Sequence, residues 1–185
     1  MLNLQEPTMV RAFTIASLIL FFTACTGNLP ESLFEKDGVS FISPEGWRQT
    51  GEKSINQSGY YISCQRKGYG SSGIFILTWV NGQVDPKVYL KNYSAEFEKN
   101  LLMRATKVHF SEPQDTSLNG IPAIRLVYTS DILGVASQGE IFSFFMVDKT
   151  FMLVFQESVD ESKKNKAGFD KIKQSFSYNP EKRLP

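Results

Sequence analysis

The chain has 185 residues, of which 42% are hydrophobic and 21% are charged, and this composition is ordinary for one globular domain. Fifteen Phe, seven Tyr and two Trp supply enough apolar volume for a core. The formal net charge of +1 excludes a general attraction to nucleic acid or anionic lipid, so we expect no nucleic-acid partner.

An uncharged apolar run of thirteen residues occupies positions 12–24. It is shorter than the ~20 residues that a membrane-spanning helix needs, and it fits the apolar region of a secretory signal peptide. Arg11 supplies the preceding positive charge. We therefore predict a signal peptide over residues 1–24, with Met9 as an alternative start. A buried N-terminal helix of a cytosolic protein is the alternative, and the turn-rich sequence that follows disfavours it.

Cys25 directly follows this run, in the sequence Phe-Thr-Ala-Cys. The four residues resemble a bacterial lipobox, in which the cysteine thiol receives a diacylglycerol and the chain is cut before the cysteine, although Phe22 replaces the usual leucine. An ordinary signal-peptidase cut after Ala24 would place Phe22 where a small residue is needed. We predict lipid attachment at Cys25, with secretion without lipid as the alternative. Thr26, instead of aspartate, favours the outer membrane over the inner one.

Cys64 is the second of the two cysteines in the sequence. If Cys25 carries lipid, Cys64 has no disulfide partner. If Cys25 is free, an oxidising compartment would allow a bridge between the two. The strand-like sequence around Cys64 indicates a buried, unreactive thiol.

The rest of the chain divides into a tether, one domain and a tail. We predict a lipidated tether over 25–36, a domain over 37–178 that starts at the turn Asp37-Gly38, and a tail over 179–185. The first strands are expected at 39–43, 60–66 and 73–80, with a tight turn from Pro44 to Trp47 between the first two. The glycine-rich segment Lys67–Gly73 joins the last two as a hairpin loop.

The central part of the chain changes from strand to helix periodicity and back. Leu90, Tyr93, Phe97 and Leu101 recur every three or four residues and predict a helix over 85–103. Asp85 is the expected N-cap, with Pro86 at the first helical position. A strand follows at 106–111. The pair Asn119-Gly120 then predicts a tight hairpin turn whose second arm is 122–130.

Two strongly apolar strands are predicted at 140–147 and 151–157, joined around Asp148-Lys149. Neither alternates apolar with polar residues, which indicates a hairpin covered on both faces. A closing helix is expected over 160–175. Its apolar side carries Phe169, Ile172 and Phe176, and its solvated side carries Lys163, Lys164, Lys166, Lys171 and Lys173.

The sequence shows no arrangement of residues typical of catalysis. His109, the one histidine, lies in a predicted strand with no nucleophile motif nearby, so we expect no catalytic role for it. Glu96 and Glu98 face apart on a helix. One histidine and two cysteines are too few for a zinc site, and we expect no metal and no cofactor. The Lys67–Gly73 segment lacks the Gly-Lys-Ser/Thr ending of a phosphate-binding loop.

Three short segments resemble the PsbP/Mog1 superfamily in their order and spacing. They are GVSFISPEGW at 38–47, LNGIPAIRLVY at 118–128 and FDKIKQSF at 169–176. The resemblance implies an α+β fold, an αβα sandwich around an antiparallel sheet. Members of that superfamily include an extrinsic photosystem II subunit, a Ran-binding nuclear protein and bacterial lipoproteins. They share no common active site, so the resemblance implies no site residues.

Together these observations predict a membrane-anchored extracytoplasmic lipoprotein that acts as a non-enzymatic binding or assembly module. We expect a protein partner in the cell envelope. One alternative is a ligand-binding or hydrolytic protein with a cleft beside Lys67–Gly73. A second alternative is a photosystem-associated subunit.

Overall fold

The computed structural model describes residues 29–55, 58–68, 70–99, 107–132 and 134–182. The predicted signal peptide and the first four residues of the predicted tether, 25–28 with Cys25 among them, lie outside these residues. None of the helices in the described part is both long enough and apolar enough to cross a bilayer.

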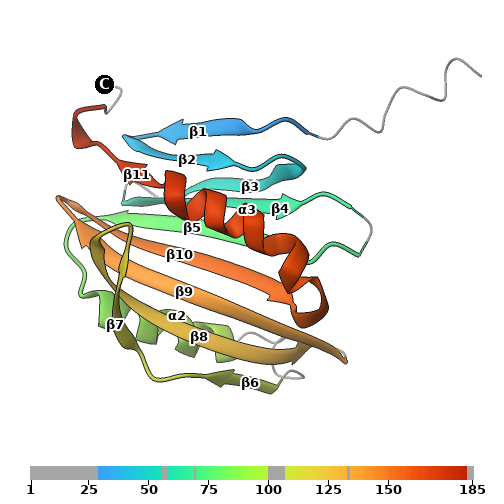
Figure 1. Ribbon diagram of the computed structural model, residues 1–185. Coiled ribbons are helices and arrows are strands. Elements are labelled where there is room, and N and C mark those ends of the chain that lie inside the picture. The colour runs from blue at the N-terminus through green and yellow to red at the C-terminus, as the bar shows by residue number, and fades with distance from the viewer. Residues whose placement is uncertain (1–28, 56–57, 69, 100–106, 133, 183–185) are drawn as a thin grey trace, which may run out of the picture.

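A large antiparallel sheet forms the centre of the molecule (Figure 1). Its strands, in spatial order, are β3 (Trp47–Ile55), β4 (Gly59–Arg66), β5 (Ile74–Asn81), β10 (Lys149–Ser158), β9 (Val135–Met146), β8 (Ile121–Ile132) and β6 (Lys107–Phe110), and β7 (Gln114–Leu118) also pairs with β8. A small sheet contains β1 (Ser32–Lys36), β2 (Val39–Ser43) and β11 (Ser177–Tyr178).

Helices cover the two faces of the large sheet. Helix α2 (Pro86–Lys99) lies behind it in Figure 1, and helix α3 (Ser162–Ser175), preceded by the short helix η1 (Val159–Glu161), crosses in front. The short helix η2 (Pro180–Lys182) follows β11. This is the α+β sandwich that the sequence predicted.

The β9–β10 hairpin is covered on both faces, as expected from its lack of alternation. Phe151 and Phe155 of β10 belong to the core under α3 and the small sheet, whereas Met152 and Val154 belong to the core under α2. Alternate residues of a strand point to opposite faces, so β10 contributes to both cores.

Three local predictions are confirmed. The Asp85 carboxylate accepts a hydrogen bond of 2.7 Å from the Lys87 amide and so caps α2. Asn119 and Gly120 have φ angles of 52° and 80° and form the turn between β7 and β8. Three residues form the buried side of the closing helix and its C-cap, as predicted: Phe169, Ile172 and Phe176.

The predicted boundary between tether and domain at residue 37 is wrong. Ser32–Lys36 form β1 and pair with β2, so the fold begins at least five residues earlier. Phe34 explains the difference, because its ring lies 5.0 Å from that of Phe41 in the core. Only this residue and the exposed Leu33 are apolar in β1, so the sequence there resembles a linker.

The predicted turn from Pro44 to Trp47 is confirmed, because the Trp47 amide donates a hydrogen bond of 3.1 Å to the Pro44 carbonyl oxygen and the indole is buried in the core. The strand β3 that begins at Trp47 was not predicted, because it is an edge strand whose mostly exposed side chains give no apolar alternation. The position of another turn needs correction. The turn of the long hairpin lies at Val147-Asp148, because Met146 pairs with Lys149. The register of β9 against β10 sets this position, and the turn places Val147 at a φ of 56°, which is strained for a β-branched residue.

Candidate functional site

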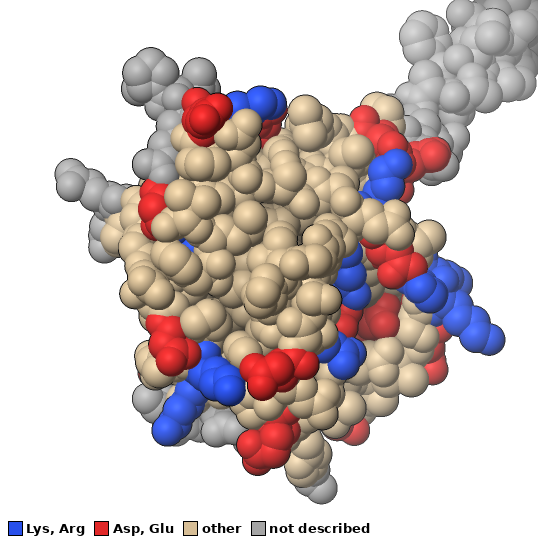
Figure 2. Space-filling view, turned by 60° about the vertical axis from the view of Figure 1, so that its left-hand side comes forward, with Lys and Arg blue, Asp and Glu red and all other residues tan. Residues whose placement is uncertain are grey.

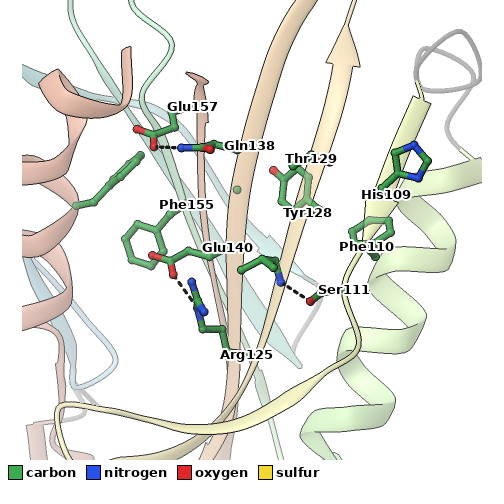
Figure 3. A pocket seen from close by; sticks show the side chains of 13 residues that line it. His109, Phe110, Ser111, Arg125, Tyr128, Thr129, Gln138, Glu140, Phe155 and Glu157 are labelled. Carbon is green, nitrogen blue, oxygen red and sulfur yellow. Dashed lines mark hydrogen bonds and ion pairs between the residues drawn. The ribbon is translucent and has the colours of Figure 1, made fainter. Parts of the chain in front are cut away.

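In Figure 1, α3 does not cross the outer strands β8 and β6 of the large sheet. A groove lies on this face beside α3 (Figure 3). Its main hollow has a volume of about 590 Å³ and is lined by residues of β6, β8, β9, β10 and α3. A smaller hollow of about 300 Å³ continues along α3 and shares Glu140, Glu157 and Phe169 with the first. We call the two together the α3 groove.

The floor of the α3 groove is a row of polar side chains that crosses four strands. His109 pairs with Thr129, Thr129 with Gln138, and Gln138 with Glu157. Directly paired residues on antiparallel strands point to the same face of a sheet, so these four side chains lie in line. Figure 3 shows the row from His109 at the outer rim to Glu157 near the helix.

Glu140 lies in the neighbouring row of the floor and has two cationic partners. The Arg125 Nε atom lies 2.9 Å from its carboxylate, and the Lys173 ammonium group of α3 donates to its other oxygen. The same ammonium lies 4.7 Å from the centre of the Phe155 ring and 5.5 Å from that of Phe142. Lys173, which the sequence placed on a solvated helix side, is therefore folded into the groove.

Glu157 has no such cation within the described part of the chain. One carboxylate oxygen accepts a hydrogen bond of 3.0 Å from the Gln138 amide group. The other oxygen is buried and has no hydrogen-bond donor among the residues that the structure describes. A buried acceptor without a partner is costly, so this oxygen would gain from a hydrogen-bond donor supplied from outside the chain.

His109 and Ser111 do not form a nucleophile–base pair in the groove. The Ser111 hydroxyl donates to the Glu112 carbonyl oxygen at 3.1 Å and accepts from the Val127 amide at 3.1 Å. His109 is exposed at the rim. Within the described ranges, no group of three or more His, Cys, Asp or Glu residues is arranged to hold a metal ion.

The Lys67–Gly73 loop, beside which a cleft was the alternative prediction, ends against closely packed residues. A Cβ atom on Gly73 would lie only 2.5 Å from the Asn165 Oδ1 atom. Arg66 donates to that same oxygen at 2.6 Å and forms an ion pair with Glu161. None of the described residues of this loop lines the hollows described above.

A second hollow, of about 600 Å³, lies between the start of α2 and the β7–β8 hairpin. Pro122, Ala123, Ile124 and Phe145 give it an apolar lining. It belongs to the end of the sheet that Figure 2 brings forward, where uncharged surface fills the centre and charged side chains lie mostly at the margin. None of the residues that line it has a buried side-chain polar atom without a hydrogen-bond partner among the described residues. The Ser143 hydroxyl, for example, donates to the Phe151 carbonyl oxygen at 3.1 Å. The α3 groove is the better candidate because it holds an unsatisfied charged group.

The sequence interpretation missed the members of the α3 groove. Thr129, Gln138 and Glu157 come from three strands, and only the strand register aligns them. Cys25, the predicted lipid attachment residue, lies outside the described residues. Cys64 is buried with 2% of its surface exposed, which agrees with the expected unreactive thiol.

Comparison with known proteins identifies the fold. No protein-family model and no curated protein sequence matches the chain. The solution structure of cyanobacterial PsbP (CyanoP) from Synechocystis superimposes with a TM-score of 0.55 at 13% identity, over 84% of this chain and 96% of that one. A crystal structure from Bacteroides thetaiotaomicron gives 0.50 at 11% identity, over 80% of this chain and 48% of that one. The protein therefore has the PsbP/Mog1-like fold, and at these identities the likeness shows the fold alone.

Proposed function

We propose that the protein is a membrane-anchored extracytoplasmic binding module, without enzymatic activity, that holds a protein of the cell envelope in the α3 groove. The observation that carries the proposal is the groove itself. It brings together a carboxylate oxygen that has no donor among the described residues and the exposed polar side chains of His109 and Thr129, on the face of the sheet beside α3. Binding sites in proteins combine such a hollow with a few well-placed polar groups.

The predicted anchor would keep this groove close to the membrane. β1 begins at Ser32, seven residues after Cys25. A fully extended segment of that length spans at most about 25 Å. Lipid on Cys25 would hold the domain within this distance of the bilayer, and Thr26 favours the outer membrane. The partner would therefore be a membrane protein or another anchored protein.

The two alternatives have less support. A hydrolase or small-ligand protein was expected to use a cleft beside Lys67–Gly73, and the end of that loop at Gly73 is closely packed. Association with a photosystem would rest on the likeness to cyanobacterial PsbP, which at 13% identity concerns the fold.

Site-specific photo-crosslinking in intact cells tests the proposed function. A photoreactive side chain would replace Thr129, which is exposed on the groove floor, or Lys53, which is exposed on the distant edge strand β3. The proposal expects one reproducible crosslinked envelope protein from position 129 and none from position 53. Identical products from both positions, or no product from position 129, would contradict it.

A further inference from the structure

We propose that the Glu157 end of the α3 groove binds an alkylammonium or guanidinium group, carried by a lysine or arginine side chain of the partner. The inference rests on the proposed function and adds the chemistry that the partner must present. It follows from three features of the groove, each of which points to a cation.

The first feature is the free oxygen of Glu157. The Gln138 amide holds the carboxylate in place through one oxygen at 3.0 Å. The second oxygen is buried and unsatisfied among the described residues, although Glu157 lines both hollows of the groove. A donor from outside would complete the carboxylate, and a charged donor would bind it about twice as strongly as a neutral one.

The second feature is a pair of largely buried phenyl rings at the hollow that this carboxylate lines. Phe155 and Phe169 line the same hollow as Glu157, with ring centroids 5.3 Å apart and ring planes 76° apart. The faces of aromatic rings attract organic cations, and the methylene groups of lysine or arginine pack on such rings. A carboxylate beside two phenyl rings therefore suits an organic cation better than a metal ion, which needs several oxygen ligands.

The third feature is a cation of the chain itself that is already bound in this way. The Lys173 ammonium donates to Glu140 and lies 4.7 Å from the centre of the Phe155 ring. Glu140 and Glu157 lie on adjacent strands and on the same face of the sheet, and Phe155 is the direct partner of Glu140. Lys173 thus satisfies Glu140 beside Phe155, whereas Glu157, which lines the same hollow as Phe155 and Phe169, has no cation among the described residues.

An NMR titration of the folded domain tests the inference. The probe is Nα-acetyl-lysine methylamide, and the control probe carries an additional acetyl group on Nε, which removes the charge. We expect saturable shifts of the Gln138 and Glu157 resonances with the charged probe, and none with the neutral one. Glu157→Gln should weaken binding about fivefold or more, whereas the matched change Glu181→Gln, at an exposed position of η2, should have no effect.

A second variant predicts a change of the opposite sign. Lys173→Met removes the internal ammonium and frees Glu140 and the Phe155 ring for the probe. Binding should strengthen about threefold or more. Lys164→Met is the control. Lys164 and Arg66 both pair with the Glu161 carboxylate, just as Lys173 and Arg125 both pair with that of Glu140. Lys164 does not line the groove. Circular dichroism would show that each variant is folded.

Several outcomes would overturn the inference. These are equal shifts with the charged and the neutral probe, unchanged binding in Glu157→Gln, or weaker binding in Lys173→Met. An n-butylammonium probe tests whether the bound cation comes from a small free amine or from a polypeptide side chain. If n-butylammonium binds more tightly than the lysine derivative, a polypeptide source of the cation is contradicted. If crosslinking from Thr129 succeeds while these titrations fail, the binding function stands and the cation inference falls.

Discussion

Gly168 of α3 lies directly against the indole ring of Trp47, the first residue of β3. A Cβ atom at position 168 would lie 2.7 Å from the indole Nε1 atom and 2.9 Å from two ring carbons. The indole in turn packs edge-on against Phe169, with ring centroids 5.4 Å apart. Helix α3, which forms one wall of the groove, can therefore pack this close to the indole of Trp47 only because residue 168 has no side chain.

The first prediction is that Gly168→Ala destabilises the protein. Alanine ordinarily stabilises a helix interior by about 1 kcal/mol relative to glycine. Here the added methyl group would overpack against Trp47, and we expect a net loss of about 1–3 kcal/mol in the free energy of unfolding. Urea denaturation measures the change. In the double variant with Trp47→Phe the cost of the methyl group should fall, and strictly additive effects would contradict the packing explanation.

The second prediction concerns the strained turn at Val147. Val147 and Asn119 have nearly the same φ, 56° and 52°, but only asparagine tolerates this conformation well. Val147 is 66% exposed, so little burial is lost on substitution. Val147→Asn should stabilise the protein by about 1 kcal/mol, seen as a higher midpoint of thermal unfolding.

The reverse change, Asn119→Val, is the matched comparison for this turn. It should destabilise the protein, because it introduces the same strain and removes the hydrogen bond from Asn119 to the Lys173 carbonyl oxygen. A Val147→Asn variant less stable than the parent chain would show that backbone strain does not govern the β9–β10 turn.

The third prediction is that a buried hydroxyl fixes the start of α2. The Thr150 hydroxyl is fully buried, accepts a hydrogen bond of 2.9 Å from the Val84 amide, and donates to the Gly82 carbonyl oxygen at 3.0 Å. Thr150→Val keeps the shape and leaves both backbone groups unsatisfied, so it should cost about 1–3 kcal/mol of stability. Thr150→Ser retains the hydroxyl, and hydrogen exchange at Val84 should remain slow only in that variant. Equal exchange rates at Val84 in the two variants would contradict this role.

The fourth prediction is a loss of stability at alkaline pH. Burial raises the pKa of the Cys64 thiol from 9.0 to about 11, and a hydrogen bond with Ser43 partly opposes the shift. Burial likewise raises the pKa of Tyr93 from 10.0 to about 12. Both groups lose their protons more easily in the unfolded chain. Their contribution to the free energy of unfolding is therefore complete below pH 9, and it declines as the pH rises through the pKa values of the folded protein.

Urea midpoints measured between pH 8 and pH 11 would test this dependence. The Cys64→Ala variant should lose less stability over that interval than the parent chain, whatever its stability at neutral pH. Parallel curves for the two proteins would show that the thiol does not contribute.

The sequence predicted the parts of the fold that short-range patterns determine. Apolar residues on both faces of the strands predicted at 140–147 and 151–157 indicated that this hairpin is covered on both sides, and Asn119-Gly120 indicated the β7–β8 turn. β1 was missed because Phe34 alone contacts the core. β3 was missed because an edge strand exposed to solvent carries polar residues and no alternation.

The α3 groove could not be predicted because it depends on register. A shift of one residue between β9 and β10 would send Gln138 and Glu157 to opposite faces of the sheet. His109 was recognised as the single histidine, but nothing in the sequence placed Thr129 beside it. Lys173 follows the spacing of the exposed lysines, and only the three-dimensional structure shows that it reaches Glu140.

Mass spectrometry of the mature N-terminus, on protein purified from cell membranes, tests the anchored binding module most directly. We predict an N-terminal peptide that begins at Cys25 and carries a diacylglycerol thioether. A Cys25→Ser variant should retain its leader and lack the lipid. An unmodified Cys25, an intact leader on the functional protein, or a Cys25–Cys64 disulfide would contradict the account.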